Sequence, residues 1–247
     1  MIFGRKIPCG NTNFHRGFCF MNTSDSNFFG TEKVSRILLK IAPPVMLAQL
    51  IQALYNIVDS LFVGKYSESG LTALSIIYPL QLLMIAIAVG TGVGINTAMA
   101  HYLGVHDEKK ANEYGGIGTP LTLVLWVLFA LICFLFMPAY ARMSTDSPEV
   151  IKDVIVYGRI VCVFSIGLFT ESIWTKILQA NGDMRTPMIA QIVGALVNIA
   201  LDPLFIFGMF GLPKLGIAGA AIATVVGQIV AALIVMRKGF RKSPQLS

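Results

Sequence analysis

Residues 71–102 read LTALSIIYPLQLLMIAIAVGTGVGINTAMAHY, a run of 32 residues without Asp, Glu, Lys or Arg. About 20 apolar residues in a helix are enough to cross roughly 30 Å of bilayer hydrocarbon. Five other long apolar runs accompany this one, at residues 34–63, 117–140, 150–180, 186–210 and 215–236. Every backbone amide in hydrocarbon must be hydrogen-bonded within the protein, and runs of this length favour helices over barrel strands. The sequence therefore predicts an all-α membrane protein with six transmembrane helices.

The composition of the 247-residue chain supports the same fold class. Hydrophobic residues make up 55% of it and charged residues only 13%, whereas a soluble domain carries roughly 25% charged residues. This balance excludes a soluble globular enzyme, a disordered chain and a disulfide scaffold. No nucleophile–base pair and no cysteine or histidine spacing typical of a metal site is present, so we expect neither an enzyme nor a metal centre.

Lys and Arg divide unequally between the two sides of the predicted helices. Thirteen fall on the side that holds both termini, and four on the other side, at Lys65, Arg142, Lys152 and Lys214. The positive-inside rule then predicts cytoplasmic termini in the inner (cytoplasmic) membrane. We expect residues 1–30 to be a disordered tail, residues 31–242 to form the helical bundle, and residues 243–247 to be a truncated cytoplasmic tail.

The first predicted helix carries a polar stripe inside a membrane-spanning segment. At 100° per residue, its four polar residues fall within about 80° of one another; they are Gln49, Gln52, Asn56 and Asp59. Pro43 and Pro44 precede the stripe and are expected to bend the helix. Intramembrane carboxylates usually face a cavity or pathway. The alternative for Asp59 is a position at the outer edge of the membrane.

The fifth predicted helix repeats this pattern. Gln191, Asn198 and Asp202 lie within about 40° of one another on a helix, and Pro203 follows directly. Proline lacks an N–H group, so it frees the carbonyl oxygen one turn earlier. A carboxylate, an amide and a free carbonyl are hard oxygen ligands that suit a proton or a small cation. The alternative is an Asn–Asp pair that holds two helices together.

The fourth and sixth predicted helices also contain polar residues. One face of the fourth, within about 80°, carries Tyr157, Glu171, Thr175 and Gln179. Glu171 is open to two interpretations, a functional site or a structural residue, and Lys176 is expected to extend toward the cytoplasmic interface. In the sixth, Thr224 and Gln228 are spaced i, i+4 among small residues. Thr224 can line a cavity or serve helix packing alone.

The glycines of VGTGVG at residues 89–94 are similar to a nucleotide-binding loop only in composition. They lie inside an apolar run, no strand precedes them, and no Gly-Lys-Ser/Thr follows. We therefore expect them to allow close packing or local bending of helices rather than to bind phosphate.

Four motifs in order resemble one known family. They are IAPPVMLAQLIQALYNIVDSLFVGKYSESGLTALS at 41–75, LQANGDMRTPM at 178–188, NIALDPLFIFG at 198–208 and LGIAGAAIATVVGQ at 215–228. Together they resemble the N-terminal six-helix lobe of a MATE-family multidrug transporter, of the bacterial DinF/MepA-like branch. The resemblance extends over about residues 31–242 and implies one lobe of a MATE-type fold.

The resemblance also implies roles for particular residues. Asp59, Asn198 and Asp202 correspond to the cation- or proton-coupling cluster of the family, and Tyr157 and Thr224 join it by position. Thr175 stands where some relatives have asparagine. Pro44 corresponds to the proline that bends the first helix. No cofactor is expected beyond a coupling ion, H⁺ or Na⁺.

The implied function is efflux of cationic amphipathic drugs in exchange for H⁺ or Na⁺. Because the family has twelve helices in two lobes, we expect this chain to be a half-length fragment whose partner is a second six-helix lobe. Two alternatives stay open, a flippase for lipid-linked substrates and a membrane interaction subunit that transports nothing. A flippase for anionic head groups would need a cationic cavity, and two buried aspartates disfavour such a cavity.

Overall fold

The computed structural model describes residues 34–209 and 213–242, which form helices joined by short turns. The helices are α2 (Val34–Tyr66), α3 (Glu68–Gly104), α4 (Glu108–Ser144), α5 (Pro148–Val163), α6 (Ile166–Ala180), α7 (Arg185–Phe207) and α8 (Ile217–Lys242). No strand occurs among these described residues, in agreement with the predicted all-α class. The two predicted tails, residues 1–30 and 243–247, lie outside them.

The chain divides into two compact units, Met1–Ala42 and Pro43–Ser247. The described part of the first unit is helical and forms the beginning of α2. The boundary falls at Pro43, and α2 continues as a helix through both Pro43 and Pro44. The bend that these prolines predict remains a prediction.

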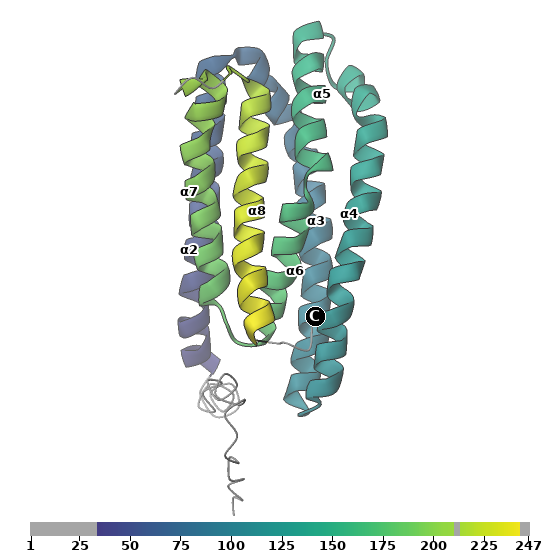
Figure 1. The fold of residues 1–247 in the computed structure, drawn as a ribbon, viewed down its shortest axis with the longest axis vertical. Coiled ribbons are helices and arrows are strands. Elements are labelled where there is room, and N and C mark those ends of the chain that lie inside the picture. The colour runs from purple at the N-terminus through teal and green to yellow at the C-terminus, as the bar shows by residue number, and fades with distance from the viewer. Residues whose placement is uncertain (1–33, 210–212, 243–247) are drawn as a thin grey trace, which may run out of the picture. The chain divides into compact units, whose positions relative to one another are not determined.

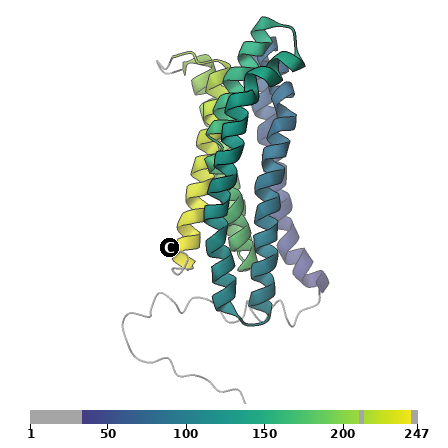
Figure 2. The same cartoon turned by 90° about the vertical axis from the view of Figure 1, so that its right-hand side faces the viewer.

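Helix α8 has α7 on one side and the α5–α6 pair on the other within the second unit (Figure 1). Helices α3 and α4 pack against each other and against α5 and α6 (Figure 2). Small residues allow the close approach of α8 to its neighbours, because Ala220, Ala221 and Ala223 are completely buried. A Cβ atom added to Gly219 would lie 2.6 Å from the Phe205 carbonyl oxygen.

The fourth predicted span is a broken helix, which corrects the prediction of one continuous helix over residues 150–180. It consists of α5 and α6, which are bent by 41° at the break. Two backbone carbonyl oxygens at the break accept hydrogen bonds from side chains. Trp126 Nε1 donates to Val163 O over 3.1 Å, and Ser165 Oγ donates to Cys162 O over 2.7 Å. A break inside the membrane is tolerated when the freed carbonyl groups are satisfied in this way.

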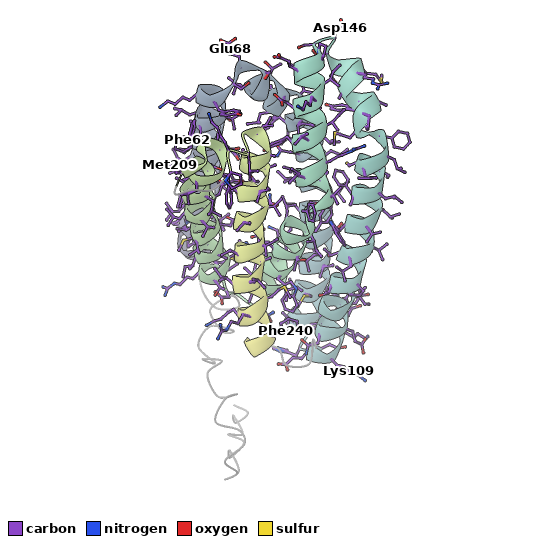
Figure 3. The ribbon with its side chains drawn as sticks, turned by 45° about the horizontal axis from the view of Figure 1, so that its top comes forward. Phe62, Glu68, Lys109, Asp146, Met209 and Phe240 are labelled. Carbon is purple, nitrogen blue, oxygen red and sulfur yellow. The ribbon has the colours of Figure 1, made fainter. Side chains whose placement is uncertain are left out.

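Within the described residues, five helices are long and apolar enough to span a membrane, and the bent α5–α6 pair makes up to six. This number agrees with the six predicted spans. Glu68 and Asp146 lie at one end of the second unit, and Lys109 and Phe240 lie at the other (Figure 3). Side chains on α4 such as Val124, Val127 and Leu128 are more than half exposed. Such a face suits hydrocarbon better than water.

Candidate functional site

Three polar side chains on α7 and α8 hydrogen-bond to one another. The Asn198 amide nitrogen donates to Asp202 Oδ1 and to Thr224 Oγ1, each over 3.4 Å. The Thr224 hydroxyl donates to the carbonyl oxygen of Ala220 over 3.0 Å. Asp202 is fully buried, and Asn198 is 2% exposed. Residues 198 and 202 share one face of α7 because of their i, i+4 spacing, and this face meets α8.

Asp59 on α2 and Tyr157 on α5 complete a group that we call the acidic cluster: Asp59, Tyr157, Asn198, Asp202 and Thr224. Asp59 is 6% exposed and lies close enough to Asp202 and Tyr157 to interact electrostatically with both. The Tyr157 hydroxyl lies near Thr224 and accepts a long hydrogen bond, 3.5 Å, from Gln81 Nε2. Four helices, α2, α5, α7 and α8, thus contribute side chains to one buried group.

Three oxygen atoms of the acidic cluster are buried without a hydrogen-bond donor, namely Asp59 Oδ1, Asn198 Oδ1 and Asp202 Oδ2. An unpartnered buried acceptor costs about 1–3 kcal/mol, and more when it is charged. Neither aspartate forms an ion pair with a Lys or Arg among the described residues. A proton or a small hard cation would supply what these oxygens lack.

A pocket adjoins the acidic cluster, and Asn198 and Thr224 belong to both. Its empty space, with the open mouth included, is about 540 Å³. The Tyr55 side chain is close enough to interact electrostatically with Asp59 and Asp202 of the acidic cluster and with Glu171 of this pocket. We call this space the polar pocket; its polar lining residues are Gln52, Tyr55, Glu171, Gln191, Asn198, Thr224 and Gln228.

Glu171 is the carboxyl-bearing lining residue of the polar pocket. It accepts a hydrogen bond from Thr175 Oγ1 over 2.9 Å, and the Gln191 side chain lies close to its carboxyl group. Lys176 is close enough to interact electrostatically, but its ammonium group donates to Gln179 Oε1 over 3.1 Å. Thr175 therefore contacts Glu171 in this structure and does not join the hydrogen bonds of the acidic cluster.

Two glycines bring α7 and α8 together at the wall of the polar pocket. A Cβ atom added to Gly194 would lie 2.8 Å from the Gly227 carbonyl oxygen. A Cβ atom added to Gly227 would lie 2.7 Å from the Gly194 carbonyl oxygen. These backbones can approach so closely only because both residues lack a side chain. Both glycines line the pocket, so they shape it as well as the helix contact.

The polar stripe predicted on the first helix is only partly buried. Asp59 is buried and Gln52 lines the pocket, whereas Gln49 and Asn56 are exposed and do not. The buried face of α2 follows residues 48, 52, 55 and 59, whose mean direction differs from the predicted stripe by about 50° at 100° per residue. The sequence analysis therefore missed Tyr55, although its spacing from Gln52 and Asp59 is the i, i+3, i+7 pattern of a helix face.

The other polar residues singled out in the sequence lie at or near the two sites. Gln191 and Glu171 line the polar pocket, and Gln228, noted only as a neighbour of Thr224, lines it too. Pro203 lies inside α7, which continues to Phe207. Gln81, which contacts Tyr157, was missed because it is a lone polar residue in an apolar run.

The glycines at residues 89–94 serve close packing at one position. A Cβ atom at Gly92 would lie 2.8 Å from the Lys176 side chain, where α3 meets α6. Nothing lies within 4 Å of a Cβ atom placed at Gly90 or Gly94. These three glycines therefore differ in what they contribute.

Curated relatives of this sequence are transport proteins. The chain is 32% identical to the probable multidrug resistance protein YoeA of Bacillus subtilis, over 78% of this chain and 42% of that protein. It is 27% identical to an FAD transporter of Shewanella oneidensis, over 80% of this chain and 44% of that protein. It is 25% identical to the probable multidrug resistance protein NorM of Thermotoga maritima, over 87% and 47%. The chain spans about half the length of these relatives.

Solved structures of transport proteins are similar in fold to this chain. A crystal structure of MATE in the bent conformation matches with a TM-score of 0.79 and 26% identity, over 86% of this chain and 46% of that one. A MOP-superfamily transporter from Pyrococcus furiosus matches with a TM-score of 0.75 and 27% identity, over 80% and 43%. The sequence model of the MatE family matches residues 44–204, which is more than half of the chain. This chain belongs to the MatE family, also called MATE, of membrane transporters.

Proposed function

We propose that this chain is one six-helix lobe of a multidrug exporter driven by H⁺ or Na⁺. The coupling ion binds at the acidic cluster, and a cationic amphipathic substrate occupies the adjoining polar pocket. The observation that carries this proposal is the set of three buried, unpartnered oxygens next to a pocket that shares Asn198 and Thr224 with them. The excess of Lys and Arg on one side supports cytoplasmic termini in the inner membrane.

The coupling follows from competition between two positive charges. A coupling ion bound near Asp59 and Asp202 reduces the negative potential that a cationic substrate meets in the pocket next to it. Binding free energies are reciprocal, so the substrate must weaken ion binding by the same factor. Each species then favours a different conformation of the lobe, which is the requirement for exchange.

The chemistry of the pocket disfavours a flippase for anionic lipid-linked substrates. Such a substrate would need Lys or Arg in its cavity, and no lining residue of the polar pocket is basic. We therefore retain the exporter as the proposed function.

The test measures competition directly. The purified chain in phospholipid nanodiscs is titrated with the amidinium dye DAPI, and its fluorescence reports binding. Replacing KCl by NaCl at equal ionic strength, or lowering the pH, is expected to weaken dye binding by about fivefold or more. Asp59→Asn and Asp202→Asn keep the shape of the side chain but remove its charge, so each should abolish this dependence.

Asp153→Asn is the matched control, since Asp153 accepts a hydrogen bond from Ser69 and belongs to neither site. It should retain the dependence of the natural chain. Dye binding that responds to neither Na⁺ nor pH, or a response that survives in both cluster variants, would contradict the proposal.

A further inference from the structure

The unpartnered buried atoms of the two sites are all hydrogen-bond acceptors. Besides the three oxygens of the acidic cluster, Gln228 Oε1 is buried without a donor and belongs to a lining residue of the polar pocket. Two unpartnered nitrogens among the described residues, Arg159 Nε and Trp174 Nε1, belong to residues that do not line the pocket. The two sites thus offer buried acceptors that a ligand with hydrogen-bond donors can satisfy.

The Glu171 carboxyl group adds further acceptor oxygens to the polar pocket. Among the described residues no Lys or Arg forms an ion pair with it, and the Lys176 ammonium group donates to Gln179 instead. The two oxygen atoms of a carboxyl group have up to about four lone-pair positions that can accept hydrogen bonds. Thr175 and the neighbouring Gln191 can fill two of them, so capacity is left for a ligand in the pocket.

The other lining residues of the polar pocket suit the apolar part of a ligand. Tyr55, Leu168 and Ala195 line it, and Gly194 and Gly227 add wall positions without side chains. A ligand with an aromatic or aliphatic body and a charged head that donates hydrogen bonds matches this arrangement. A quaternary ammonium head has the same charge but no N–H group, so it would leave the acceptors of Glu171 and Gln228 unpaired.

We propose that the polar pocket selects cations that carry N–H donors, such as primary ammonium, amidinium or guanidinium groups, over quaternary ammonium ions. This inference rests on the proposed function and specifies the substrate class within it. The physical reason is that buried polar groups discriminate strongly against an analogue that lacks their hydrogen-bonding partner. Charge alone would not separate the two classes, because both carry one positive charge.

The experiment compares two ligands that differ only at the charged head. The chain in phospholipid nanodiscs is titrated calorimetrically with 1-naphthylmethylammonium and with its N,N,N-trimethyl derivative, and empty nanodiscs correct for partition into lipid. We expect the primary ammonium ion to bind at least about tenfold more tightly. Equal binding, tighter binding of the trimethyl ion, or no binding of either would overturn the inference.

Two variants assign the preference to the pocket. Glu171→Leu and Gln228→Leu each remove acceptor oxygens without a replacement, so each should reduce the preference at least about threefold by weakening the ammonium ion more than the trimethyl ion. Gln49→Leu is the matched control, because Gln49 is exposed and outside the pocket. If both pocket variants weaken the two ligands equally, or leave the preference unchanged, the inference is wrong. Circular dichroism verifies that each variant is folded.

The outcome separates this inference from the proposed function. A missing N–H preference together with intact competition by Na⁺ or protons overturns the inference alone. Intact preference without any competition overturns ion coupling alone.

Discussion

At the scale of single residues, the glycines of α7 and α8 offer a controlled test of the site's architecture. Gly227→Ala would place a Cβ atom 2.7 Å from the Gly194 carbonyl oxygen, so the helices must separate. Overpacking of this kind costs about 1–3 kcal/mol. We expect a lower thermal unfolding temperature in detergent and weaker dye binding in the polar pocket.

Gly90→Ala is the matched control, since nothing lies within 4 Å of its added Cβ atom. Alanine favours helix over glycine by about 1 kcal/mol, so this variant should be as stable as the natural chain or more so. An equal loss of stability in both variants would show that the α7–α8 contact is not the cause.

At the scale of elements, one of the two side-chain donors at the break between α5 and α6 comes from another helix, α4. Trp126→Phe removes the indole N–H that bonds to Val163 O, but it keeps an aromatic ring. Leaving this carbonyl unpartnered should cost about 1–3 kcal/mol. Thermal unfolding measures the loss, and hydrogen exchange should increase around residues 163–169. Unchanged stability and exchange would mean that the break does not need Trp126.

The sequence predicts the features of these helices that depend on local geometry, but not those that depend on packing between helices. Apolar length predicts the spanning helices, and i, i+4 spacing predicts the Asn198–Asp202 pair, because both depend on local geometry alone. The bend at Val163–Ser165 depends on a donor from α4, 37 residues away. The exact face of α2 depends on its neighbours, so the polar stripe was placed about 50° from the buried face. The i, i+4 spacing likewise predicts that Thr175 lies beside Glu171, whereas Gln191 comes to Glu171 from another helix, α7.

At the scale of the whole molecule, the described helices correspond to one lobe of a MATE-type transporter. Its polar side chains include Gln49, Asn56 and the members of both sites, and groups of this kind are costly in hydrocarbon. Alternating access requires one body to move against another around the binding site. The described helices are nevertheless long and apolar enough for insertion, so we expect the 247-residue chain to insert with six spans, the bent α5–α6 pair counted as one. Reactivity of single cysteines placed in the connecting turns checks this topology.

The central claim, a transporter lobe that works only as part of a pair, is tested most directly by export from cells. The chain is expressed alone in efflux-deficient bacteria, gradient-driven dye export is measured, and the mass of the purified protein in detergent is determined from the same cells. We expect no export by the single chain, and export only where it assembles with a second copy or with a separate second lobe. Gradient-driven export by a monomeric chain would contradict it.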